Sequence, residues 1–358
     1  MDFVKLASIC NLKQWSTIAK TDLSDSGYPV WGANGIIGYS NKYNHTERTI
    51  MICCRGATCG SINISDGKCY INGNAMCLDN LSKEFNLDFI AYYLKNYDFK
   101  KTITGVAQPQ ITKVSLDIVE VPKLPIERQQ EIAQNLKKLE LCLTKTRIKL
   151  KKYDDLVKSQ FIEMFGDVIS NPMNWNTKSI VDITDIKGFN GEIEKINNKV
   201  WLLNLDMVES RSGQIISKVY VDKNQVGNST TTFNESYVLY SKLRPYLNKV
   251  VLPNTSGYCT TELIPLLPNK EILNKYFLCE SLRSESFVRF IQEKVAGAKM
   301  PRVQPKIFKE FKLILPPIEL QNQFADFVKH IDKLKFTIKQ SVEKLELCYK
   351  SLMKQYFE

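Results

Sequence analysis

The sequence predicts a mixed α/β fold (α+β), in which two strand-rich modules alternate with two long helices. Three observations support this prediction: segments that repeat at a fixed offset, a heptad pattern after each of two prolines, and short apolar runs separated by turn residues in front of each heptad segment. The expected order along the chain is a module at 1–123, a helix at 124–165, a module at 166–315 and a helix at 316–358.

The repeat is ungapped and has an offset of 192 residues. Residues 105–110 (GVAQPQ) align with 297–302 (GAKMPR), and 125–129 (PIERQ) align with 317–321 (PIELQ). Such internal similarity is typical of a structural unit that is used twice in one chain.

The segment after each proline has the apolar spacing of a coiled coil. Proline suits the first position of a helix and the following glutamate suits its positive end, so each helix should start at the repeated motif. Each helix would be about forty residues long, or roughly 60 Å. We expect the two to pair antiparallel within the chain, although pairing between chains stays open. The apolar seam positions are Ile132, Leu136, Leu139, Leu143, Leu150, Tyr153 and Val157 in the first helix, and Phe324, Val328, Ile331, Ile338, Val342, Leu345 and Tyr349 in the second.

Two seam positions are polar, Thr146 in the first helix and Lys335 in the second. A buried lysine would loosen the helix pair at that point unless its ammonium group reaches solvent.

The modules in front of the helices have strand-like and helix-like segments. Short apolar runs predict strands at 49–52, 68–71, 200–203, 237–240 and 249–252, with hairpin-type turns at 34–35 and 66–67. Helices are expected at 86–97 and 271–293. Parts of the two modules also align at an offset of 188, with Ile52 matching Tyr240 and Tyr70 matching Tyr258. The modules are therefore expected to be related but divergent.

The charge balance favours a polyanionic partner. The 358 residues contain 49 Lys+Arg against 38 Asp+Glu, a formal net charge of +11, and nucleic acid is the commonest partner for such an excess. No apolar run approaches the ~18 residues that a membrane span needs, and the start of the chain lacks a signal-peptide pattern. We expect a cytoplasmic protein without membrane contact, whose ten cysteines are reduced thiols.

Catalytic and metal-binding patterns are not found. The glycine-rich run at 32–38 lacks the lysine of a phosphate-binding loop, and 171–174 (NPMN) lacks the aromatic residue that would stack on a flipped base. Asp66 and Asp185 are each followed two residues later by a lysine, as in some metal nucleases, but two or more clustered carboxylates would be needed to hold the ion. Neither histidine, His45 or His330, lies near a nucleophile in sequence. We therefore predict no catalytic residue, no metal site and no enzymatic activity.

Glycine- and proline-containing loops carry the residue types that read DNA. Arg, Lys, Asn and Gln can reach base edges while other basic residues contact phosphates. The loop at 55–60 has a more basic counterpart at 242–249, and the repeated segments 108–110 and 299–302 have polar or basic side chains around a proline. The DNA-binding candidates are Arg55, Thr58, Lys68, Gln108, Gln110, Lys242, Arg244, Tyr246, Lys249, Lys299 and Arg302.

Several of these segments together resemble the specificity (S) subunit of type I restriction-modification systems. They are 28–39 (YPVWGANGIIGY), 237–246 (YVLYSKLRPY), the junction 165–175, and the two Pro-Ile-Glu-x-Gln helix starts. The resemblance extends over essentially the whole chain, and the repeated order of module and helix is its most specific feature.

The resemblance implies that each module is a target recognition domain that reads one half of an asymmetric bipartite site in double-stranded DNA. The two helices would form the antiparallel coiled coil, set the spacer between the half-sites and dock two methyltransferase (M) subunits. S-adenosylmethionine would bind to the M subunits. ATP and Mg would bind to restriction (R) subunits, which could join the complex. This chain itself would need no cofactor.

Three alternatives remain open from the sequence. A stand-alone DNA-binding protein, such as a repressor, would have the same basic loops and no enzymatic partner. An enzyme with an unrecognised site is a second alternative. A coiled-coil scaffold is a third, although it would leave the basic modules without a purpose.

Overall fold

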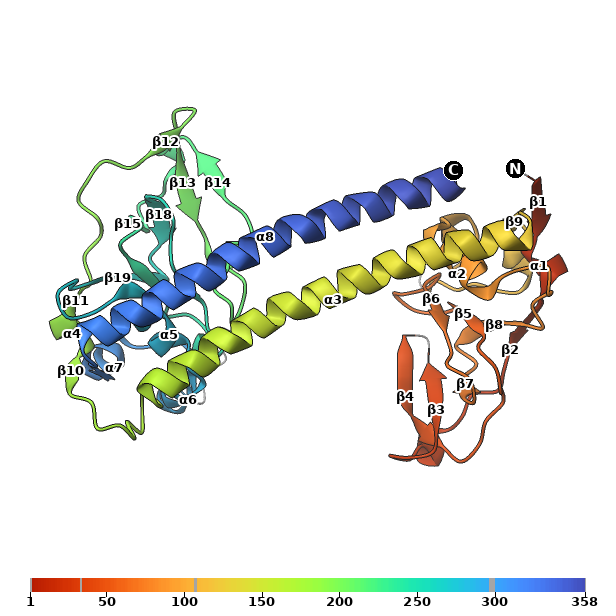
Figure 1. Ribbon diagram of the computed structural model, residues 1–358, viewed down its shortest axis with the longest axis horizontal. Helices are drawn as coiled ribbons and strands as arrows, with labels where there is room; N and C mark the ends of the chain where they lie inside the picture. Colours follow the sequence, from red (N-terminus) through yellow and green to blue (C-terminus); the bar gives the residue numbers. More distant parts are fainter. Residues whose placement is uncertain (1, 33, 106–107, 296–299, 358) are drawn as a thin grey trace. The chain divides into compact units, whose positions relative to one another are not determined.

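The computed structural model describes residues 2–32, 34–105, 108–295 and 300–357. The chain divides into two compact units, unit 1 comprising Met1–Arg147 with Gln340–Glu358, and unit 2 comprising Ile148–Lys339. Each unit combines sheets and helices, which confirms the mixed α/β class. The two long helices, α3 (Ile126–Phe165) and α8 (Ile318–Phe357), each contribute residues to both units (Figure 1).

Unit 1 is built on a four-stranded antiparallel sheet with the order β2-β8-β5-β6. Its strands are β2 (Asn11–Gln14), β5 (Ile50–Cys53), β6 (Ile62–Ile64) and β8 (Ala75–Asp79). Every residue of β5 is buried, because β5 lies in the interior of the sheet and its apolar side chains fill the core on both faces. Helix α2 (Leu87–Asn96) contacts β6 and contributes Phe89 and Ile90 to the same core.

The remaining elements of unit 1 close the module and extend it. Strand β1 (Asp2–Lys5) pairs with β9 (Glu120–Lys123) and leads into the short helix α1 (Leu6–Ile9). A separate small sheet has the order β4-β3-β7, formed by β3 (Tyr28–Gly32), β4 (Gly35–Ser40) and β7 (Tyr70–Ile71). Strands β3 and β4 form a hairpin at the turn predicted for Asn34-Gly35, with Gly35 as the first residue of β4.

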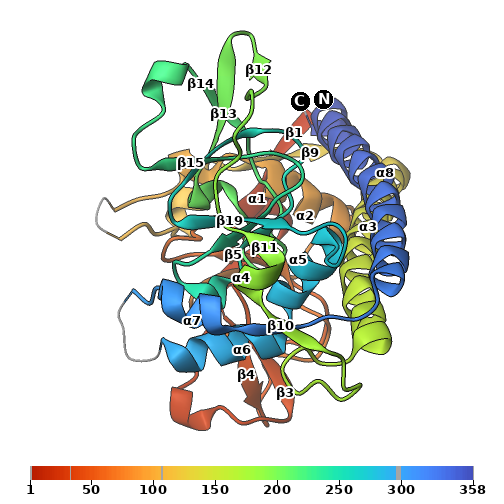
Figure 2. The same ribbon diagram turned by 90° about the vertical axis from the view of Figure 1, so that its left-hand side faces the viewer.

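Unit 2 has an equivalent four-stranded sheet with the order β11-β19-β16-β17. Its strands are β11 (Thr184–Asp185), β16 (Val238–Ser241), β17 (Val250–Val251) and β19 (Leu263–Pro268). Strand β10 (Thr177–Ser179) pairs with β20 (Lys312–Ile314), as β1 does with β9. The helices of the unit's module are α4 (Ile180–Ile183), α5 (Lys275–Arg283), α6 (Glu285–Lys294) and α7 (Pro305–Glu310); α4 contacts α7 and α5 contacts α6 (Figure 2).

The second sheet of unit 2 is larger than its counterpart in unit 1. It consists of β12 (Lys195–Ile196), β13 (Lys199–Leu203), β14 (Val219–Val221), β15 (Thr230–Phe233) and β18 (Gly257–Thr260). Its parallel pair Leu202↔Tyr258 repeats the pair Val30↔Tyr70 of unit 1. The divergence between the modules is thus concentrated in this second sheet.

The offset of 188 residues proves to relate secondary structure as well as sequence. It places β5 on β16 residue for residue and the first residue of α2 on the first residue of α5. The predicted relationship between the two modules is therefore confirmed for the main sheet and the helix beside it.

Two details of the sequence-based prediction are wrong. The helix expected at 271–293 is broken into α5 and α6 at Ser284, whose hydroxyl accepts a hydrogen bond from the Phe287 N–H (3.3 Å) and so caps a new helix. The turn at Asp66-Gly67 is not a hairpin, since β6 and β7 on either side of it pair with β5 and β3 respectively. The strands expected at 49–52, 68–71, 200–203, 237–240 and 249–252 and the helix at 86–97 are present within one or two residues.

The long helices pair antiparallel within each unit, as predicted (Figure 1). In unit 1, Ile132 and Leu136 of α3 share a core with Met353 of α8. In unit 2, the Phe161 and Phe324 rings meet edge to face with centroids 5.4 Å apart. All fourteen predicted seam positions are buried or half-buried. The chain therefore supplies both strands of its own coiled coil.

The polar seam position Lys335 is accommodated by an ion pair. Its ammonium group binds the Asp154 carboxylate of the opposing helix, and its side chain is 23% exposed. The helix pair therefore closes at this position with a charge-paired contact.

A buried glutamine joins each long helix to its module. In unit 1, Gln129 is fully buried. Its Nε2 donates to the carbonyl oxygens of Glu84 (2.9 Å) and Leu124 (2.8 Å), and its Oε1 accepts from the N–H of Asn86 (2.8 Å). Asn86 is also the residue that caps α2. One side chain thus connects the start of α3, the end of β9 and the start of α2.

The same connection occurs in unit 2 at the equivalent residues. Gln321 is fully buried, donates to the carbonyls of Ile272 (3.1 Å) and Pro316 (2.8 Å), and accepts from the N–H of Asn274 (2.9 Å), the cap of α5. Because buried polar groups are costly unless they are hydrogen-bonded, this bonding explains why glutamine ends the repeated Pro-Ile-Glu-x-Gln motif.

Gln129→Leu should destabilise unit 1, because an apolar side chain of similar size leaves one buried N–H and two carbonyls without their partner. We expect the free energy of unfolding to fall by about 2–4 kcal/mol, measured by urea denaturation. The matched control is Gln130→Leu at the neighbouring exposed position, which should change it by less than about 0.5 kcal/mol. Equal losses in the two variants would refute the proposed role of Gln129.

Candidate nucleic-acid interface

Two of the predicted DNA-binding segments of unit 1 lie side by side. The loop between β5 and β6 contains Arg55, and the backbone of Arg55 bridges to that of Gln110. The next residue, Ile111, donates its N–H to the Cys54 carbonyl (3.0 Å). Gln110 in turn exchanges two backbone hydrogen bonds of 2.9 Å with Thr104. Segments about fifty residues apart in sequence therefore form one surface.

The candidate side chains on this surface are exposed. Arg55, Thr58, Gln108 and Gln110 are all exposed, and Arg55 forms no ion pair with any residue that the structure describes. The Thr58 hydroxyl lies 3.4 Å from the Cys53 thiol at the base of the loop. A guanidinium or a side-chain amide that is exposed in this way can donate to phosphates or to base edges.

Unit 2 brings the equivalent segments together in the same way. Leu243 bridges to Arg302, and Val303 donates its N–H to the Lys242 carbonyl (2.9 Å). These contacts are the counterparts of Arg55–Gln110 and Ile111–Cys54 at the two offsets found in the sequence. Arg244 adds a further bond by donating its N–H to the Pro301 carbonyl (2.8 Å). In both units, therefore, two loops are joined by a backbone bridge and a neighbouring hydrogen bond, at the corresponding end of the four-stranded sheet.

The loop in unit 2 has a strained backbone. Arg244 adopts the left-handed conformation (φ 50°, ψ 64°), as does Asn248 four residues later (φ 48°, ψ 53°). Between them lies the short 3₁₀ helix Pro245–Leu247, anchored by the buried Pro245. The Asn248 amide donates to the Arg283 carbonyl (2.7 Å), which holds the end of the loop. The exposed side chains of this loop are those of Arg244 and Tyr246.

Arg302 has a charged partner that the sequence did not reveal. Its Nη2 lies 3.2 Å from Oε1 of Glu262, and its Nε donates to Oε2 (3.3 Å). Glu262 comes directly before β19, and its carbonyl accepts from the Lys242 N–H (3.0 Å). The offset of 188 residues aligns Asn74 of the first module with Glu262, and this alignment is the sequence signal that could have drawn attention to Glu262.

Two of the three remaining lysine candidates, Lys68 and Lys249, are placed differently. Lys68 lies over the rings of Tyr28 (5.3 Å) and Tyr43 (4.4 Å), and no contact joins it to the two loops of unit 1 within the described part of the chain. Lys249 is half-buried and donates to the Leu205 carbonyl (2.6 Å). Lys299 lies outside the described residues. The structure therefore groups Arg55, Thr58, Gln108 and Gln110 in unit 1, and Lys242, Arg244, Tyr246 and Arg302 in unit 2.

The cysteines beside the unit 1 loops are poorly suited to nucleophilic chemistry. Burial raises the pKa of the Cys54 thiol to about 12, and burial also raises the pKa of Cys59. Both are neutral thiols at physiological pH, whereas the thiolate is the nucleophile and the metal ligand.

One group of potential metal ligands lies in unit 1, formed by His45, Cys77 and Asp79. Asp79 Oδ1 lies 3.0 Å from His45 Nε2, and its Oδ2 accepts from the indole N–H of Trp15 (3.0 Å). His45 Nδ1 lies 2.7 Å from the side-chain oxygen of Asn44. Burial raises the pKa of the Cys77 thiol well above its ordinary range, so this group is explained as a hydrogen-bonded cluster of the core.

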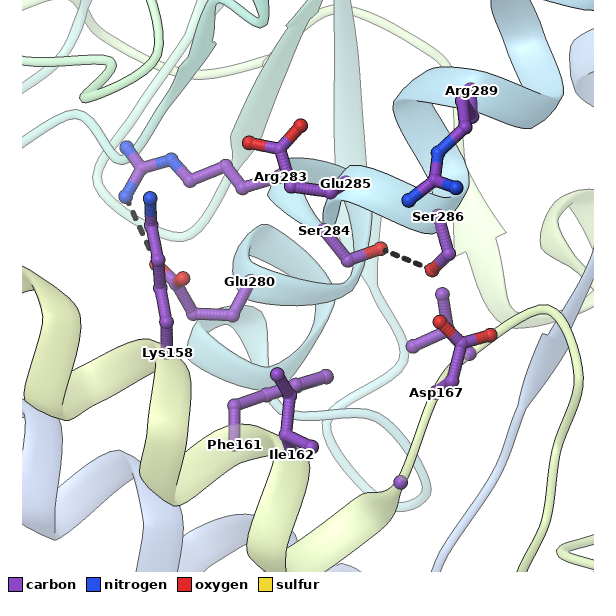
Figure 3. A pocket seen from close by; sticks show the side chains of 12 residues that line it. Lys158, Phe161, Ile162, Asp167, Glu280, Arg283, Ser284, Glu285, Ser286 and Arg289 are labelled. Carbon is purple, nitrogen blue, oxygen red and sulfur yellow. Dashed lines mark hydrogen bonds and ion pairs between the residues drawn. The ribbon is translucent and has the colours of Figure 1, made fainter.

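A pocket of about 260 Å³ in unit 2 lies between the end of α3 and the junction of α5 and α6 (Figure 3). Phe161 and Ile162 form an apolar part of its lining, and Lys158 and Asp167 are among its charged residues. Burial tends to raise the pKa of Asp167, but hydrogen bonds from Ser170 and the N–H of Ile169 hold it below its usual range. The lining residues come from both the long helix and the module of unit 2.

The chain is similar to proteins of known type. Residues 1–152 and 172–347 match the family described as type I restriction modification DNA specificity domain. The type I restriction enzyme MjaVIII specificity subunit of Methanocaldococcus jannaschii is 31% identical over 101 residues, which cover 28% of this chain and 23% of that protein. The EcoDI specificity subunit of Escherichia coli is 23% identical over 173 residues, covering 48% and 38%. The matched segments thus span less than two-fifths of either relative.

Solved structures share the fold over the whole chain. The S subunit of a type I restriction-modification system from M. genitalium superposes with a TM-score of 0.66 at 17% identity, covering 100% of this chain and 96% of that one. A chain from a solved structure concerned with the complex assembly and conformational transition of the type I R-M system superposes with a TM-score of 0.54 at 13% identity. The match covers 100% of this chain and 97% of that one.

The strain at Arg244 has a measurable consequence for stability. A left-handed conformation costs a side-chain-bearing residue about 1–2 kcal/mol, whereas glycine adopts it freely. Arg244→Gly should therefore unfold with a free energy about 1 kcal/mol higher than that of Arg244→Ala, measured by urea denaturation of the two variants. If the alanine and glycine variants are equally stable, residue 244 does not adopt a strained left-handed conformation.

Proposed function

Because the chain belongs to the family of type I restriction modification DNA specificity domains, we propose that it is the DNA-sequence-reading subunit of a type I restriction-modification complex. The observation that carries this proposal is the pair of linked loops that occurs in both units. In both units the residue at the second bridge position, Gln110 or Arg302, has an exposed amide or guanidinium group at an equivalent point of the backbone. These residue types are the ones that donate to phosphates and read base edges in the grooves of DNA.

The two units are proposed to read different sequences. The residue at the first bridge position is Arg55 in unit 1 and Leu243 in unit 2, and the residue at the second is Gln110 in unit 1 and Arg302 in unit 2. The loop of unit 2 also has an exposed tyrosine, Tyr246. Since different donors recognise different base edges, the target is proposed to be an asymmetric bipartite site with one half read by each unit.

The long helices are proposed to fix the spacer between the half-sites and to dock two methyltransferase (M) subunits. Each helix contributes to both units, so a change in helix length acts on both. Large apolar side chains are also exposed along the helices, and such groups mark protein contacts. In unit 1 they are Leu141 and Leu347, and in unit 2 they are Ile148, Leu156, Ile162, Leu334 and Phe336. Ile162 also lines the pocket at the end of α3.

Catalysis is proposed to reside in the partners. Methyl transfer to adenine would be carried out by the M subunits with S-adenosylmethionine, and ATP- and Mg-dependent cleavage by restriction (R) subunits if these join the complex. No cofactor is proposed for this chain. The complex would act in the cytoplasm, where its DNA is. None of the described helices is both long enough and apolar enough to span a membrane.

The exposed apolar side chains on the helices favour this proposal over a stand-alone DNA-binding protein. A repressor of this build would expose Ile162 and Phe336, 61% and 64% accessible, to solvent without a purpose. Co-purification with a methyltransferase subunit distinguishes the two, since a repressor would bind its operator tightly by itself.

Mapping modified adenines across the genome, in cells with and without this protein, tests the proposed function. We expect one asymmetric bipartite motif to lose its methylation when the protein is absent.

Arg244→Ala should weaken recognition of the second half-site only, and methylation of the motif should fall for that reason. The binding free energy should fall by about 1–3 kcal/mol if the arginine contacts a base. An unchanged methylation map in cells without the protein would contradict the proposal. So would an Arg244→Ala variant that weakens recognition of both half-sites equally.

Changing the length of both long helices tests the proposed spacer. Inserting seven residues into exposed parts of α3 and α8 at matching positions preserves the heptad seam and adds about 10 Å to each helix. The expected result is a methylated motif with the same half-sites and a longer spacer, read from the same genome-wide map. Retention of the original spacer would show that the helices do not set it.

A further inference from the structure

Position 110 in unit 1 and position 302 in unit 2 have the same backbone surroundings. Each is bridged to the loop that follows the central strand of the main sheet, at Arg55 and Leu243 respectively. Each is followed by an apolar anchor, Ile111 or Val303, which is only 2% exposed. The residue before a fixed anchor is therefore held at a defined place on the surface in both units.

A third segment of the chain contacts these loops in both units. The Asn74 carbonyl accepts from the Cys54 N–H (2.9 Å) in unit 1, and the Glu262 carbonyl accepts from the Lys242 N–H (3.0 Å) in unit 2. Asn74 and Glu262 are thus equivalent residues, each directly before the strand that neighbours β5 or β16. Unit 1 has the neutral residues Asn74 and Gln110 at these two positions, whereas unit 2 has the charged residues Glu262 and Arg302.

The geometry of the charged pair leaves part of the guanidinium free. Glu262 engages the Nε and Nη2 side of Arg302 through its two carboxylate oxygens. A guanidinium has five N–H donors, so the two on Nη1 and the second on Nη2 remain. These are the donors at the end of the side chain, and together they can contact O6 and N7 of a guanine. The Arg302 side chain is 57% exposed, so this end can be reached by a ligand.

The carboxylate is suited to orienting the arginine rather than to strengthening DNA binding. An exposed ion pair contributes little to stability, and a carboxylate near DNA is repelled by the phosphates. Its benefit is to restrict the rotamers of a long side chain, so that less conformational freedom is lost on binding. The neutral Gln110 of unit 1 needs no such partner, which accounts for the neutral Asn74 at the equivalent place.

We propose that positions 110 and 302 are one base-reading position used twice, at which Gln110 recognises an adenine and Arg302 a guanine, with Glu262 as the positioning residue of Arg302. Glutamine pairs with N6 and N7 of adenine as arginine pairs with O6 and N7 of guanine. The proposal rests on the proposed function of the chain and adds the class of base that each half-site contains at this point.

Transplanting the unit 1 pair into unit 2 tests the proposal directly. The double variant Glu262→Asn, Arg302→Gln is assembled with its methyltransferase subunits and presented with DNA in which both half-sites are randomised. The wild-type complex should select a guanine at one base pair of that half, and the double variant should select an adenine there. The preference at the first half-site should be the same in both, which shows that the complex still reads DNA. Unaltered selection by the double variant would overturn the proposal.

The failure of the wild-type complex to select any bipartite site would instead count against the proposed function itself. The matched control is the double variant Lys178→Gln, Asp182→Asn, which also removes one positive and one negative charge, at exposed positions of β10 and α4 outside the loops. It should leave base selection in both halves unchanged. A shift with this control equal to that of the double variant would show that the loss of any two exposed charges in unit 2 changes the selection, and would also overturn the proposal.

A second variant isolates the role of Glu262. Glu262→Ala should lower the ratio of binding to guanine-containing over adenine-containing sites by about five- to tenfold, without changing the melting temperature of the protein. Glu262→Asp should restore part of the ratio. A lower melting temperature with an unchanged ratio would show that Glu262 is merely structural. Arg302→Lys should abolish most of the discrimination, since lysine lacks the planar fork.

Discussion

The hydrogen bonds of the buried glutamines Gln129 and Gln321 are the interaction on which each unit depends. Each side chain accepts from the N–H of the residue that caps the module helix, and it donates to two carbonyls, one just before that helix and one just before the long helix. Because three backbone groups depend on one buried amide, the long helix cannot change its direction relative to the module without leaving polar groups unsatisfied. The loops on the sheet are thereby held in a defined geometry with respect to the helix inside each unit.

This constraint explains which parts of the two copies are the same and which differ. The motif that supplies the glutamine, the four-stranded sheet and the helix seam are all repeated, because each is needed to bury the same surfaces. The linked loops keep their backbone bonds but differ in side chains, as Gln110 and Arg302 do. A scaffold with a fixed backbone and exchangeable surface residues is a physical basis for reading two different DNA sequences with one fold.

The sequence predicted the parts of the structure that depend on local or periodic signals. The heptad seam, the helix starts and the loops that carry Arg55 and Arg244 follow from spacing and from turn residues. It did not predict the break at Ser284, because the apolar pattern continues through it and a side-chain cap decides the outcome. It also missed Glu262, since an ion pair over forty residues depends on strand pairing that no local signal shows. The base-reading roles remain predictions.

The central claim, that each unit reads one half-site through its linked loops, can be tested by hydrogen–deuterium exchange on the assembled complex. The complex would be measured with its full target and with targets in which one half-site is scrambled. Scrambling the first half should remove protection at 54–61 and 108–111 while protection at 242–249 and 300–303 persists, and scrambling the second half should do the reverse. Loss of protection at both sets of loops with either target, or protection confined to the long helices, would contradict the claim.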